Sequence, residues 1–322
     1  MDSTVRALVL GGSGFVGRHV CAAFAAAGAE VIAVSRTITE LPGTRTIRLD
    51  LADTDPWRLG DLLAAAAPTV VVNAAGRVWG VYGDELVSSN VTLVDRVVQA
   101  ACALPRPVRL IHIGSVHEYG PVPFGQPIDE RTPPRPVDPY GRTKLIGSQR
   151  VLDACAAGRL DAVVLRVGNV TGPDTPAGSL LGRAAGQLAE AARNGEPAVL
   201  RLAPLRSRRD FVDVRDVARA ITAAATAPVR GAVVNIGRGE AVSVRWLVHA
   251  LIEASGLPAR VEERADPAGN AHRGTGIDWQ QIDPSAARRL LGWQPRLTLR
   301  ESLRALWEAC AAATGVLPRS TF

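Results

Sequence analysis

The stretch VRALVLGGSGFVGRHV, residues 5–20, leads from a short apolar run through a glycine-rich turn into a helix-forming run. The turn carries Gly11, Gly14 and Gly17 at three-residue spacing, with Phe15 and Val16 between the last two. Glycine permits a tight turn and a close backbone approach, and the amino end of a helix favours negative charge. The stretch therefore predicts a strand, turn and helix that bind the pyrophosphate of a dinucleotide through residues 11–17. A turn without a ligand is the alternative interpretation.

Outward from this stretch, short β-branched runs alternate with alanine-rich runs, the pattern of parallel βαβ units. The intervening helices are expected to begin near residues 15, 56, 84 and 139. This order predicts an α/β fold with a Rossmann-type doubly wound parallel sheet that binds ligands at the carboxyl ends of its strands. The six expected strands cover residues 5–10, 30–35, 46–49, 69–73, 108–113 and 162–167.

After Val167 the alternation loosens, which indicates a second structural unit. We expect residues 1–170 to form the dinucleotide-binding domain, with return segments near 210–240. Residues 171–322 are expected to form mainly a smaller, interlaced substrate lobe. Its expected helices cover residues 180–193, 214–225, 242–254 and 284–291, and its expected strands cover 199–202 and 232–236.

Composition narrows the class of protein. The 322 residues are 47% apolar and 21% charged, which is ordinary for a globular protein. The net charge is +6, but no basic run interleaves with aromatic residues, so we expect no nucleic-acid partner. No apolar run reaches the roughly 18 residues of a membrane span. The four cysteines lack the spacing of a metal site and are expected to be buried free thiols of a cytoplasmic protein without a metal.

The second predicted strand ends in Ser35 and Arg36, where a carboxylate is usual when the ribose 2′-hydroxyl is free. A hydroxyl and a guanidinium suit a 2′-phosphate instead. We therefore expect a preference for NADP(H), with NAD(H) possible. Arg36 as a solvated surface residue is the alternative.

Further cofactor contacts are expected at the ends of later strands. Asp50, followed by Leu51, is placed to accept the adenine amino group, although it is equally suited to cap a helix. The small residues Ala74, Ala75 and Gly76 leave room for the ribose beside the nicotinamide. Val167 ends the sixth expected strand and completes this set.

The chain has one lysine, Lys144, four residues after Tyr140 in the segment PYGRTK. A compact ammonium reaches a ribose hydroxyl where a guanidinium is too broad. At i and i+4 of a helix that starts at Pro139, both side chains share one face. With Ser115 at the end of the fifth strand, they form a predicted proton-transfer set in which Lys144 lowers the pKa of Tyr140. A structural tyrosine and lysine are the alternative.

Taken together, these motifs resemble the extended short-chain dehydrogenase/reductases, the NAD-dependent epimerase/dehydratase family. The likeness extends over nearly the whole chain, through GGSGFVG, NAAG, SSNVTLVDRVVQAA, LRVGNVTGP, RRDFVDVRDVA and ARRLLGWQP. The resemblance implies a nucleotide-sugar substrate held by Asn169, Arg209 and Arg273, and places Asn90 close to the active site. Arg209 paired with Asp210 or Asp213, and Asn90 satisfying helix backbone groups, are the structural alternatives.

The chain also departs from this family at positions that bear on the reaction. Sugar dehydratases of the family carry Thr-Asp-Glu where this chain has Ser115, Val116 and His117, so dehydration is not expected. Glu118 is displaced by one residue and is expected to point elsewhere. His117, Trp79 and Tyr82 are expected to line a sugar pocket.

The remaining reactions are ketone reduction and 4-epimerisation. The Ser35–Arg36 pair, the segment HEYGPVPFGQPIDERTPPRPVDPYG and a composition like that of high-GC actinomycetes favour a 4-ketoreductase of deoxysugar and antibiotic biosynthesis. The expected substrate is a dTDP-4-keto-6-deoxyhexose. An NAD-retaining 4-epimerase, a reductase of another ketone and an NADP(H)-binding protein without turnover are the alternatives. The resemblance further implies a homodimer through helices at 84–103 and 139–157.

Overall fold

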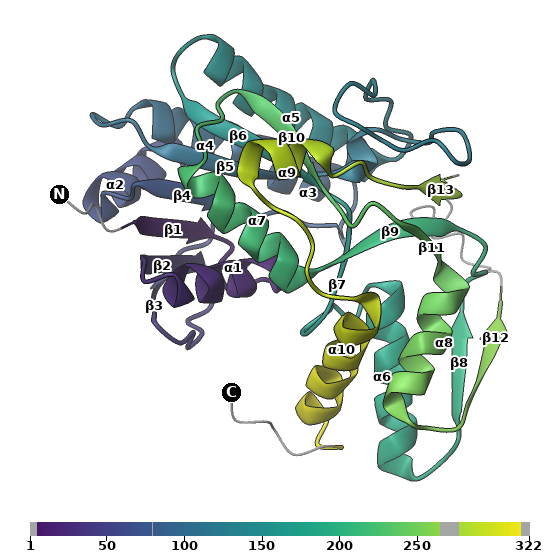
Figure 1. Cartoon of the computed structure of the whole chain (residues 1–322). Helices are drawn as coiled ribbons and strands as arrows, with labels where there is room; N and C mark the ends of the chain where they lie inside the picture. Colours follow the sequence, from purple (N-terminus) through teal and green to yellow (C-terminus); the bar gives the residue numbers. More distant parts are fainter. Residues whose placement is uncertain (1–4, 79, 265–276, 317–322) are drawn as a thin grey trace.

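The computed structural model describes residues 5–78, 80–264 and 277–316. In these residues the central element is a seven-stranded sheet in the order β10-β6-β5-β4-β1-β2-β3 (Figure 1). All of its neighbouring strands pair in parallel. Its strands are β1 (Arg6–Leu10), β2 (Glu30–Ser35), β3 (Thr44–Arg48), β4 (Val70–Asn73), β5 (Arg109–Ser115), β6 (Asp161–Val167) and β10 (Ala232–Ile236). The predicted doubly wound α/β fold is confirmed.

Helices cover both faces of this sheet, which explains why its strands are apolar along their whole length. In β1, Ala7 and Val9 face one helical layer, whereas Leu8 and Leu10 face the other. The first layer contains α1 (Phe15–Ala26), α7 (Val214–Thr226) and α9 (Ser285–Leu291). The second contains α2 (Pro56–Ala66), α4 (Leu93–Cys102) and α5 (Pro139–Ala156).

Between β4 and α4, the chain forms α3 (Gly83–Val87) and one π-helical turn, Ser88–Thr92. A 3₁₀ turn, Val116–Glu118, follows β5. Both turns lie after carboxyl ends of strands, where the predicted ligand site belongs.

A second group of elements forms a smaller lobe, which lies below the sheet in Figure 1. Its helices α6 (Leu180–Asn194), α8 (Val244–Ser255) and α10 (Leu299–Ala313) share one apolar core. One of its sheets contains β7 (Asn169–Thr171), β9 (Arg208–Asp213), β11 (Ala241–Ser243) and β13 (Trp279–Gln280), and the other pairs β8 (Ala198–Leu202) with β12 (Ala259–Glu263). The helix expected at 242–254 begins at Val244 instead, because residues 241–243 pair with β9 and Ser243 caps the helix.

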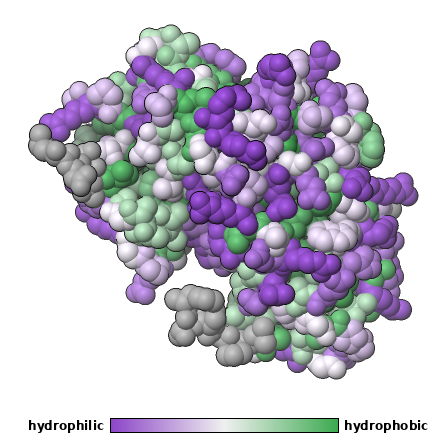
Figure 2. Space-filling model, viewed as in Figure 1, coloured by the Kyte–Doolittle hydropathy of each residue, from purple (hydrophilic) through white to green (hydrophobic). Residues whose placement is uncertain are grey.

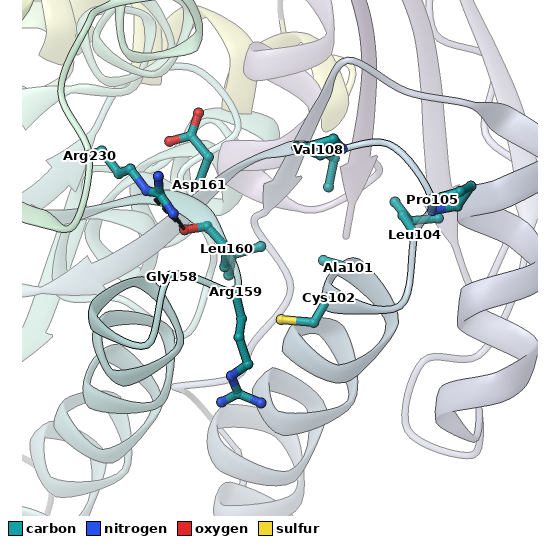
Figure 3. Close-up of a pocket in the computed structure, with 11 residues that line it drawn as sticks. Ala101, Cys102, Leu104, Pro105, Val108, Gly158, Arg159, Leu160, Asp161 and Arg230 are labelled. Carbon is teal, nitrogen blue, oxygen red and sulfur yellow. Dashed lines mark hydrogen bonds between the residues drawn. The ribbon is translucent and has the colours of Figure 1, made fainter.

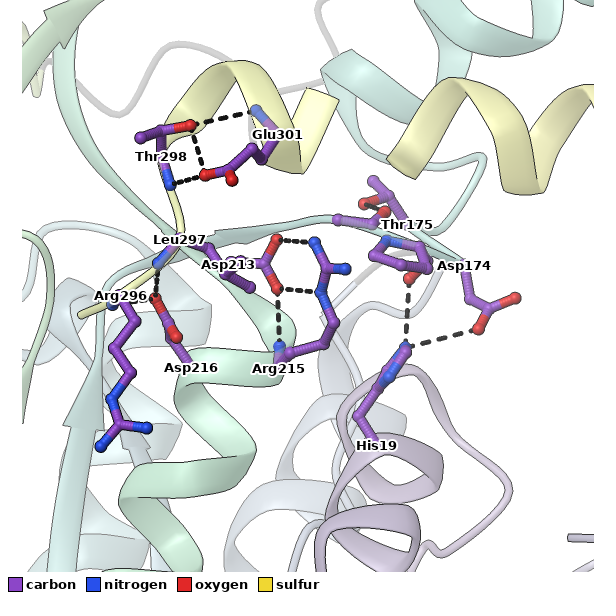
Figure 4. A network of polar contacts seen from close by, with 12 residues as sticks. His19, Asp174, Thr175, Asp213, Arg215, Asp216, Arg296, Leu297, Thr298 and Glu301 are labelled. Atoms are coloured by element: carbon purple, nitrogen blue, oxygen red, sulfur yellow. Dashed lines mark hydrogen bonds and ion pairs between the residues drawn. The ribbon is translucent and has the colours of Figure 1, made fainter. Parts of the chain in front are cut away.

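Polar contacts fasten the two groups together (Figure 4). Asp216 of α7 accepts the backbone N–H groups of Arg296 and Leu297, at 2.9 and 3.0 Å, in the segment that leads to α10. On the other side, His19 Nε2 of α1 lies 3.2 Å from the carbonyl oxygen of Pro173 and 3.4 Å from Asp174. The smaller lobe is therefore held against both α1 and α7.

On the face shown in Figure 2, hydrophilic side chains predominate and hydrophobic ones are interspersed among them. Within the described ranges, no helix is both long and apolar enough to cross a membrane.

Candidate active site

The glycine-rich turn between β1 and α1 is shaped by close backbone contact. Gly11 has a φ of 77°, a conformation that favours glycine. A Cβ added at Gly17 would lie 2.1 Å from the carbonyl oxygen of Gly11, so only glycine fits there. Gly14 precedes the first residue of α1, Phe15, and no side chain caps the helix amino end. Uncapped N–H groups and a bare backbone fit a diphosphate at this position.

At the end of β2, the two residues expected to contact a 2′-phosphate have different surroundings. Ser35 is buried, and its hydroxyl donates to the carbonyl of Thr37 at 2.5 Å. Arg36 is exposed beyond the same strand end. The guanidinium is therefore the group open to an added phosphate, whereas the Ser35 hydroxyl already stabilises its own turn.

Asp50 and Leu51 follow β3. Asp50 is exposed and accepts the N–H of Ala52 at 3.0 Å. The helix cap of α2 is Asp55, which accepts the N–H of Arg58 at 2.7 Å. The alternative interpretation of Asp50 as a helix cap is therefore wrong. Leu51 is buried in the apolar core beside the end of β3.

The loop after β4 lies directly against the glycine-rich turn. A Cβ at Gly11 would lie 2.9 Å from the backbone of Ala75, so Ala74 and Ala75 flank this turn. Asn90 holds the next part of the loop: its Nδ2 donates to the carbonyl of Arg77 at 3.0 Å, and its Oδ1 accepts the N–H of Arg77 at 3.3 Å. Asn90 Oδ1 also lies beside Gly76. Asn90 therefore fixes a loop beside the site, and the alternative in which it satisfies helix backbone groups is wrong.

Ser115, Tyr140 and Lys144 meet at the carboxyl end of β5. Ser115 is the last residue of β5 and lies in register with Val167 at the end of β6. Tyr140 and Lys144 lie on α5, whose first residue is Pro139, and the Tyr140 hydroxyl interacts with that of Ser115. Lys144 Nζ donates to the carbonyl of Ile113 in β5 at 2.6 Å. The structure thus brings together the three residues of the predicted proton-transfer set.

Burial dominates the electrostatics of this set. Burial raises the pKa of Tyr140 to about 12, against the hydrogen bond with Ser115, which lowers it. Burial also lowers the pKa of Lys144 to about 8, while the charge of Glu118 acts in the opposite direction. The expected lowering of the Tyr140 pKa by Lys144 is therefore wrong for this structure, in which desolvation of the phenol dominates.

His117 lies beside Tyr140, in the 3₁₀ turn that follows Ser115. Its ring meets the Tyr140 ring edge to face, with centroids 5.7 Å apart. Its backbone N–H donates to Ser115 Oγ at 3.2 Å, and its Nδ1 lies 3.1 Å from Asp138 Oδ2. Sequence reasoning missed Asp138, although an aspartate before a proline at a helix start is a recognisable capping signal.

Glu118 points into the protein. The expectation that it points away from the site assumed an extended segment, whereas Val116–Glu118 forms a 3₁₀ turn. Glu118 is fully buried and accepts from the backbone N–H of Ser115, the hydroxyl of Ser148 and Arg166 Nε, at 2.8, 2.9 and 2.7 Å. Its carboxylate therefore supports the strand end that carries Ser115.

Two of the predicted substrate residues, Asn169 and Arg209, lie on strands β7 and β9 of the smaller lobe. Asn169 Nδ2 donates to the carbonyl of Asp210 and to Gln280 Oε1, so this amide joins strands. Arg209 donates to the carbonyl of Ile277 at 3.2 Å. Burial lowers the pKa of its guanidinium, whereas Asp278 and Asp138 act in the opposite direction. Arg209 of the smaller lobe and Asp138, which precedes α5 of the main sheet, therefore interact electrostatically.

Five other predicted positions complete the set, and three of them lie among the described residues. Asp213 binds Arg215 at 2.8 Å, and Asp210 accepts backbone N–H groups of Arg238 and Gly239, so both carboxylates serve backbone or local contacts. Tyr82 is exposed at the start of α3. Trp79 and Arg273 lie outside the described residues.

A pocket of about 280 Å³ lies between the α4–β5 and α5–β6 connections (Figure 3). These connections lead into the amino ends of β5 and β6, whereas the proton-transfer set lies at the carboxyl ends. Arg230 spans the pocket wall by donating to the carbonyl of Leu160. This pocket therefore lies at the amino ends of the strands, opposite the candidate active site at their carboxyl ends.

The cysteines are free, as expected, and Cys21 and Cys155 are buried. The expected burial is wrong for Cys102 and Cys310, which are partly exposed. Burial raises the pKa of all four thiols, which disfavours the reactive thiolate. In the part of the chain that the structure describes, no group of three or more His, Cys, Asp or Glu residues is placed to hold a metal ion.

Comparisons with known proteins agree with this geometry. The model of the NAD dependent epimerase/dehydratase family matches residues 7–237. The dTDP-6-deoxy-L-talose 4-dehydrogenase (NAD(P)(+)) of Kitasatospora kifunensis is 44% identical over 309 residues, which cover 96% of each chain.

Solved structures show the same architecture. MoeE5 in complex with UDP-glucuronic acid and NAD is 29% identical, with a TM-score of 0.81 over 96% of this chain and 99% of that one. RMD from Pseudomonas aeruginosa, complexed with NADPH, is 25% identical, with a TM-score of 0.78 over 96% of this chain and 100% of that one. The chain is an enzyme of the extended short-chain dehydrogenase/reductases and belongs to the NAD-dependent epimerase/dehydratase family.

Proposed function

We propose that this chain reduces the C4 ketone of a dTDP-4-keto-6-deoxyhexose with NADPH. The observation that carries the proposal is the meeting of Ser115, Tyr140 and Lys144 at the strand edge that also holds the glycine-rich turn. The 44% identical relative, named for dehydrogenation at C4 of a dTDP-6-deoxyhexose, supports this position of attack and this nucleotide. The reverse of such a dehydrogenation is a ketone reduction.

Each residue of the set has its own role in the proposed reduction. A bound nicotinamide supplies the hydride. Ser115 Oγ binds the C4 oxygen, and Tyr140 donates its phenolic proton as negative charge develops on that oxygen. The raised pKa of Tyr140 keeps this proton in place until it is needed. Lys144, whose Nζ is anchored on the Ile113 carbonyl, is placed to orient the nicotinamide ribose.

The cofactor and substrate are proposed to lie in one continuous site. Residues 11–17 hold the diphosphate, Arg36 the 2′-phosphate, Asp50 and Leu51 the adenine, and residues 74–76 with Asn90 and Val167 the nicotinamide half. His117, Asn169, Arg209 and Arg273 are assigned to the nucleotide sugar. An arginine is well suited to a diphosphate, because its fork of N–H groups binds two oxygens at once.

The direct test is oxidation of NADPH by the purified protein with a set of nucleotide-linked 4-keto-6-deoxyhexoses. We expect stoichiometric NADPH loss with a dTDP-linked ketone, and NMR of the product then gives its C4 configuration. Interconversion of two sugars without net NADPH loss would instead show a 4-epimerase. NADPH binding without turnover of any ketone would show a binding protein.

We also propose a cytoplasmic homodimer that packs through residues 84–103 and 139–157. Two apolar side chains on these helices, Val87 and Ile146, are 45% and 44% exposed. Ile146→Glu should shift the mass measured by light scattering to that of one chain. Ile38→Glu, at an apolar residue that is 72% exposed elsewhere, is the matched control and should leave the mass unchanged.

A further inference from the structure

His117 touches both members of the proton-donating pair. Its backbone N–H binds Ser115 Oγ at 3.2 Å, and its ring packs edge to face on Tyr140 at 5.7 Å between centroids. A Cβ at Gly141 would lie 2.4 Å from the His117 carbonyl oxygen, so α5 and the turn after β5 are in tight contact here. The imidazole is therefore a neighbour of the phenol that backbone packing fixes in place.

Asp138 determines which nitrogen of this imidazole carries a proton. One of its carboxylate oxygens, Oδ1, accepts the N–H of Gly141 at 2.7 Å and caps α5. The other, Oδ2, lies 3.1 Å from His117 Nδ1. A carboxylate only accepts hydrogen bonds, so Nδ1 must hold a proton. In neutral His117 the lone pair is then on Nε2, and in the protonated form Nε2–H is a donor.

The surroundings leave His117 Nε2 available for proton transfer. Among the described residues it has no hydrogen-bond partner, and the His117 side chain is 19% exposed. Among the described residues, Arg209 of β9 is a charged group that acts on Asp138, the partner of His117. Glu118, the next residue in the chain, is turned inward to Arg166 and does not compete for the imidazole.

The other two members of the set, Ser115 and Lys144, are buried, and the Lys144 ammonium donates to the Ile113 carbonyl of β5. The His117 side chain is more open to solvent than either of them. Each reduction leaves Tyr140 as a phenolate, which must be protonated before the next ketone is reduced. An imidazole can both accept and donate a proton through its ring nitrogens, which suits this step.

We propose that His117, oriented by Asp138, returns the proton to Tyr140 after each turnover. The inference rests on the proposed function. In the reaction, the Tyr140 O–H bond breaks as the O–H bond of the C4 carbinol forms. Protonated His117 then gives its Nε2 proton to the phenolate, directly or through one water, and neutral His117 takes a proton from solvent. The bond broken is N–H, the bond formed is the phenolic O–H, and the electron pair stays on Nε2.

The test separates the first turnover from the later ones. In His117→Gln, Tyr140 begins protonated. At saturating ketone, used because His117 is also assigned to the sugar, the loss of rate for the first NADPH oxidised per site should therefore be much smaller than the loss in steady state. Steady-state turnover should fall by roughly tenfold or more, and added imidazole should restore much of it. An unchanged steady state, an equal loss in the first turnover, or no rescue by imidazole would overturn the proposal. Absence of turnover in the wild type would instead refute the proposed function.

Asp138→Asn gives a second readout that does not depend on activity. Asparagine also caps helices, but with its oxygen on Gly141 its NH₂ group faces Nδ1 and moves the imidazole proton to Nε2. Nitrogen-15 NMR of labelled protein should show His117 protonated on Nδ1 in the wild type and on Nε2 in the variant. The matched control is Asp55→Asn, because Asp55 also precedes a proline and caps its helix at 2.7 Å. The control should leave the His117 signals unchanged, and a wild-type proton on Nε2 would refute the role of Asp138.

Discussion

Glu118 and Arg166 form an ion pair in the interior, with Glu118 Oε2 2.7 Å from Arg166 Nε and both side chains at most 5% exposed. The guanidinium of Arg166 also lies over the ring of Tyr119, 4.5 Å from its centroid. This pair lies directly behind Ser115, whose N–H binds the same carboxylate. The position of the serine hydroxyl thus depends on a buried charge pair that has no contact with the sugar in the proposed mechanism.

Glu118→Gln keeps the shape of the side chain but leaves Arg166 as an uncompensated buried cation. Breaking a buried pair in this way costs about 3–5 kcal/mol. We therefore expect the free energy of unfolding in urea to fall by that order. Arg131→Ala is the comparison, because Arg131 is exposed and its pair with Asp129 should contribute little to stability. Equal losses in the two variants would contradict the proposed support of the strand end.

Tyr140→Phe removes the proton donor while keeping the ring. We expect turnover of the ketone to fall by roughly 10²–10⁴-fold, because that is the usual contribution of general acid catalysis. NADPH binding, followed by its fluorescence, should change little. Turnover close to the wild-type value would reject Tyr140 as the donor.

Arg36→Asp tests the preference for a 2′-phosphate. Loss of a charge-assisted hydrogen bond, worth about 1.5–3 kcal/mol, should lower kcat/KM for NADPH by roughly 10- to 100-fold relative to NADH. Arg45→Asp, at an exposed arginine on neighbouring β3, is the control. A wild-type enzyme that already prefers NADH would refute the assignment before any variant is made.

Gly17→Ala tests the close backbone contact in the first turn of α1. The added methyl group would lie 2.1 Å from the Gly11 carbonyl, so the turn must open, and we expect loss of dinucleotide binding together with a lower Tm. Gly60→Ala is the matched control within α2, where a Cβ meets nothing within 4 Å. There the same substitution should stabilise the helix by about 0.5–1 kcal/mol.

The single lysine gives the protein a distinctive pH dependence. The pKa of Lys144 is about 8 in the folded chain and 10.5 as an ordinary lysine, so between these values the unfolded chain binds more protons. Stability must then rise as pH increases from about 8. We expect the free energy of unfolding between pH 7.5 and 9.5 to gain on the order of 1–2 kcal/mol relative to Lys144→Met. The cysteines and tyrosines titrate in both proteins, so the difference isolates Lys144, and parallel curves would contradict its buried environment.

Much of the fold and part of the site could be predicted from sequence because their signals are local. The turn at Gly11–Gly17, the start of α5 at Pro139 and the i, i+4 pair of Tyr140 and Lys144 each depend on neighbouring residues. Strand β3 begins two residues earlier than expected, because its alternating TRTIR pattern at the sheet edge lacks a continuous apolar run. Short strands such as β7 and β13 could not be predicted, since their pairing depends on β9, whose partner residues are 42 positions from those of β7 and 71 from those of β13.

Contacts between residues that are distant in sequence could not be predicted either. The Glu118–Arg166 pair joins residues 48 positions apart, and the His117–Asp138 pair joins residues 21 positions apart. Nothing in the local pattern indicates either pair. The pKa of Tyr140 was also beyond local reasoning, because it depends on how deeply the phenol is packed rather than on the identity of the residue four positions later.

Strand β10 has a consequence for engineering. The chain leaves the main sheet after β6, builds part of the smaller lobe, and then returns to hydrogen-bond β10 alongside β6. A chimera that joins residues 1–170 to the remainder of a relative would therefore import a foreign edge strand together with the new sugar-recognition elements. Exchange of specificity between relatives requires three crossovers, one after β6 and one on each side of β10, so that the native strand stays with its own sheet.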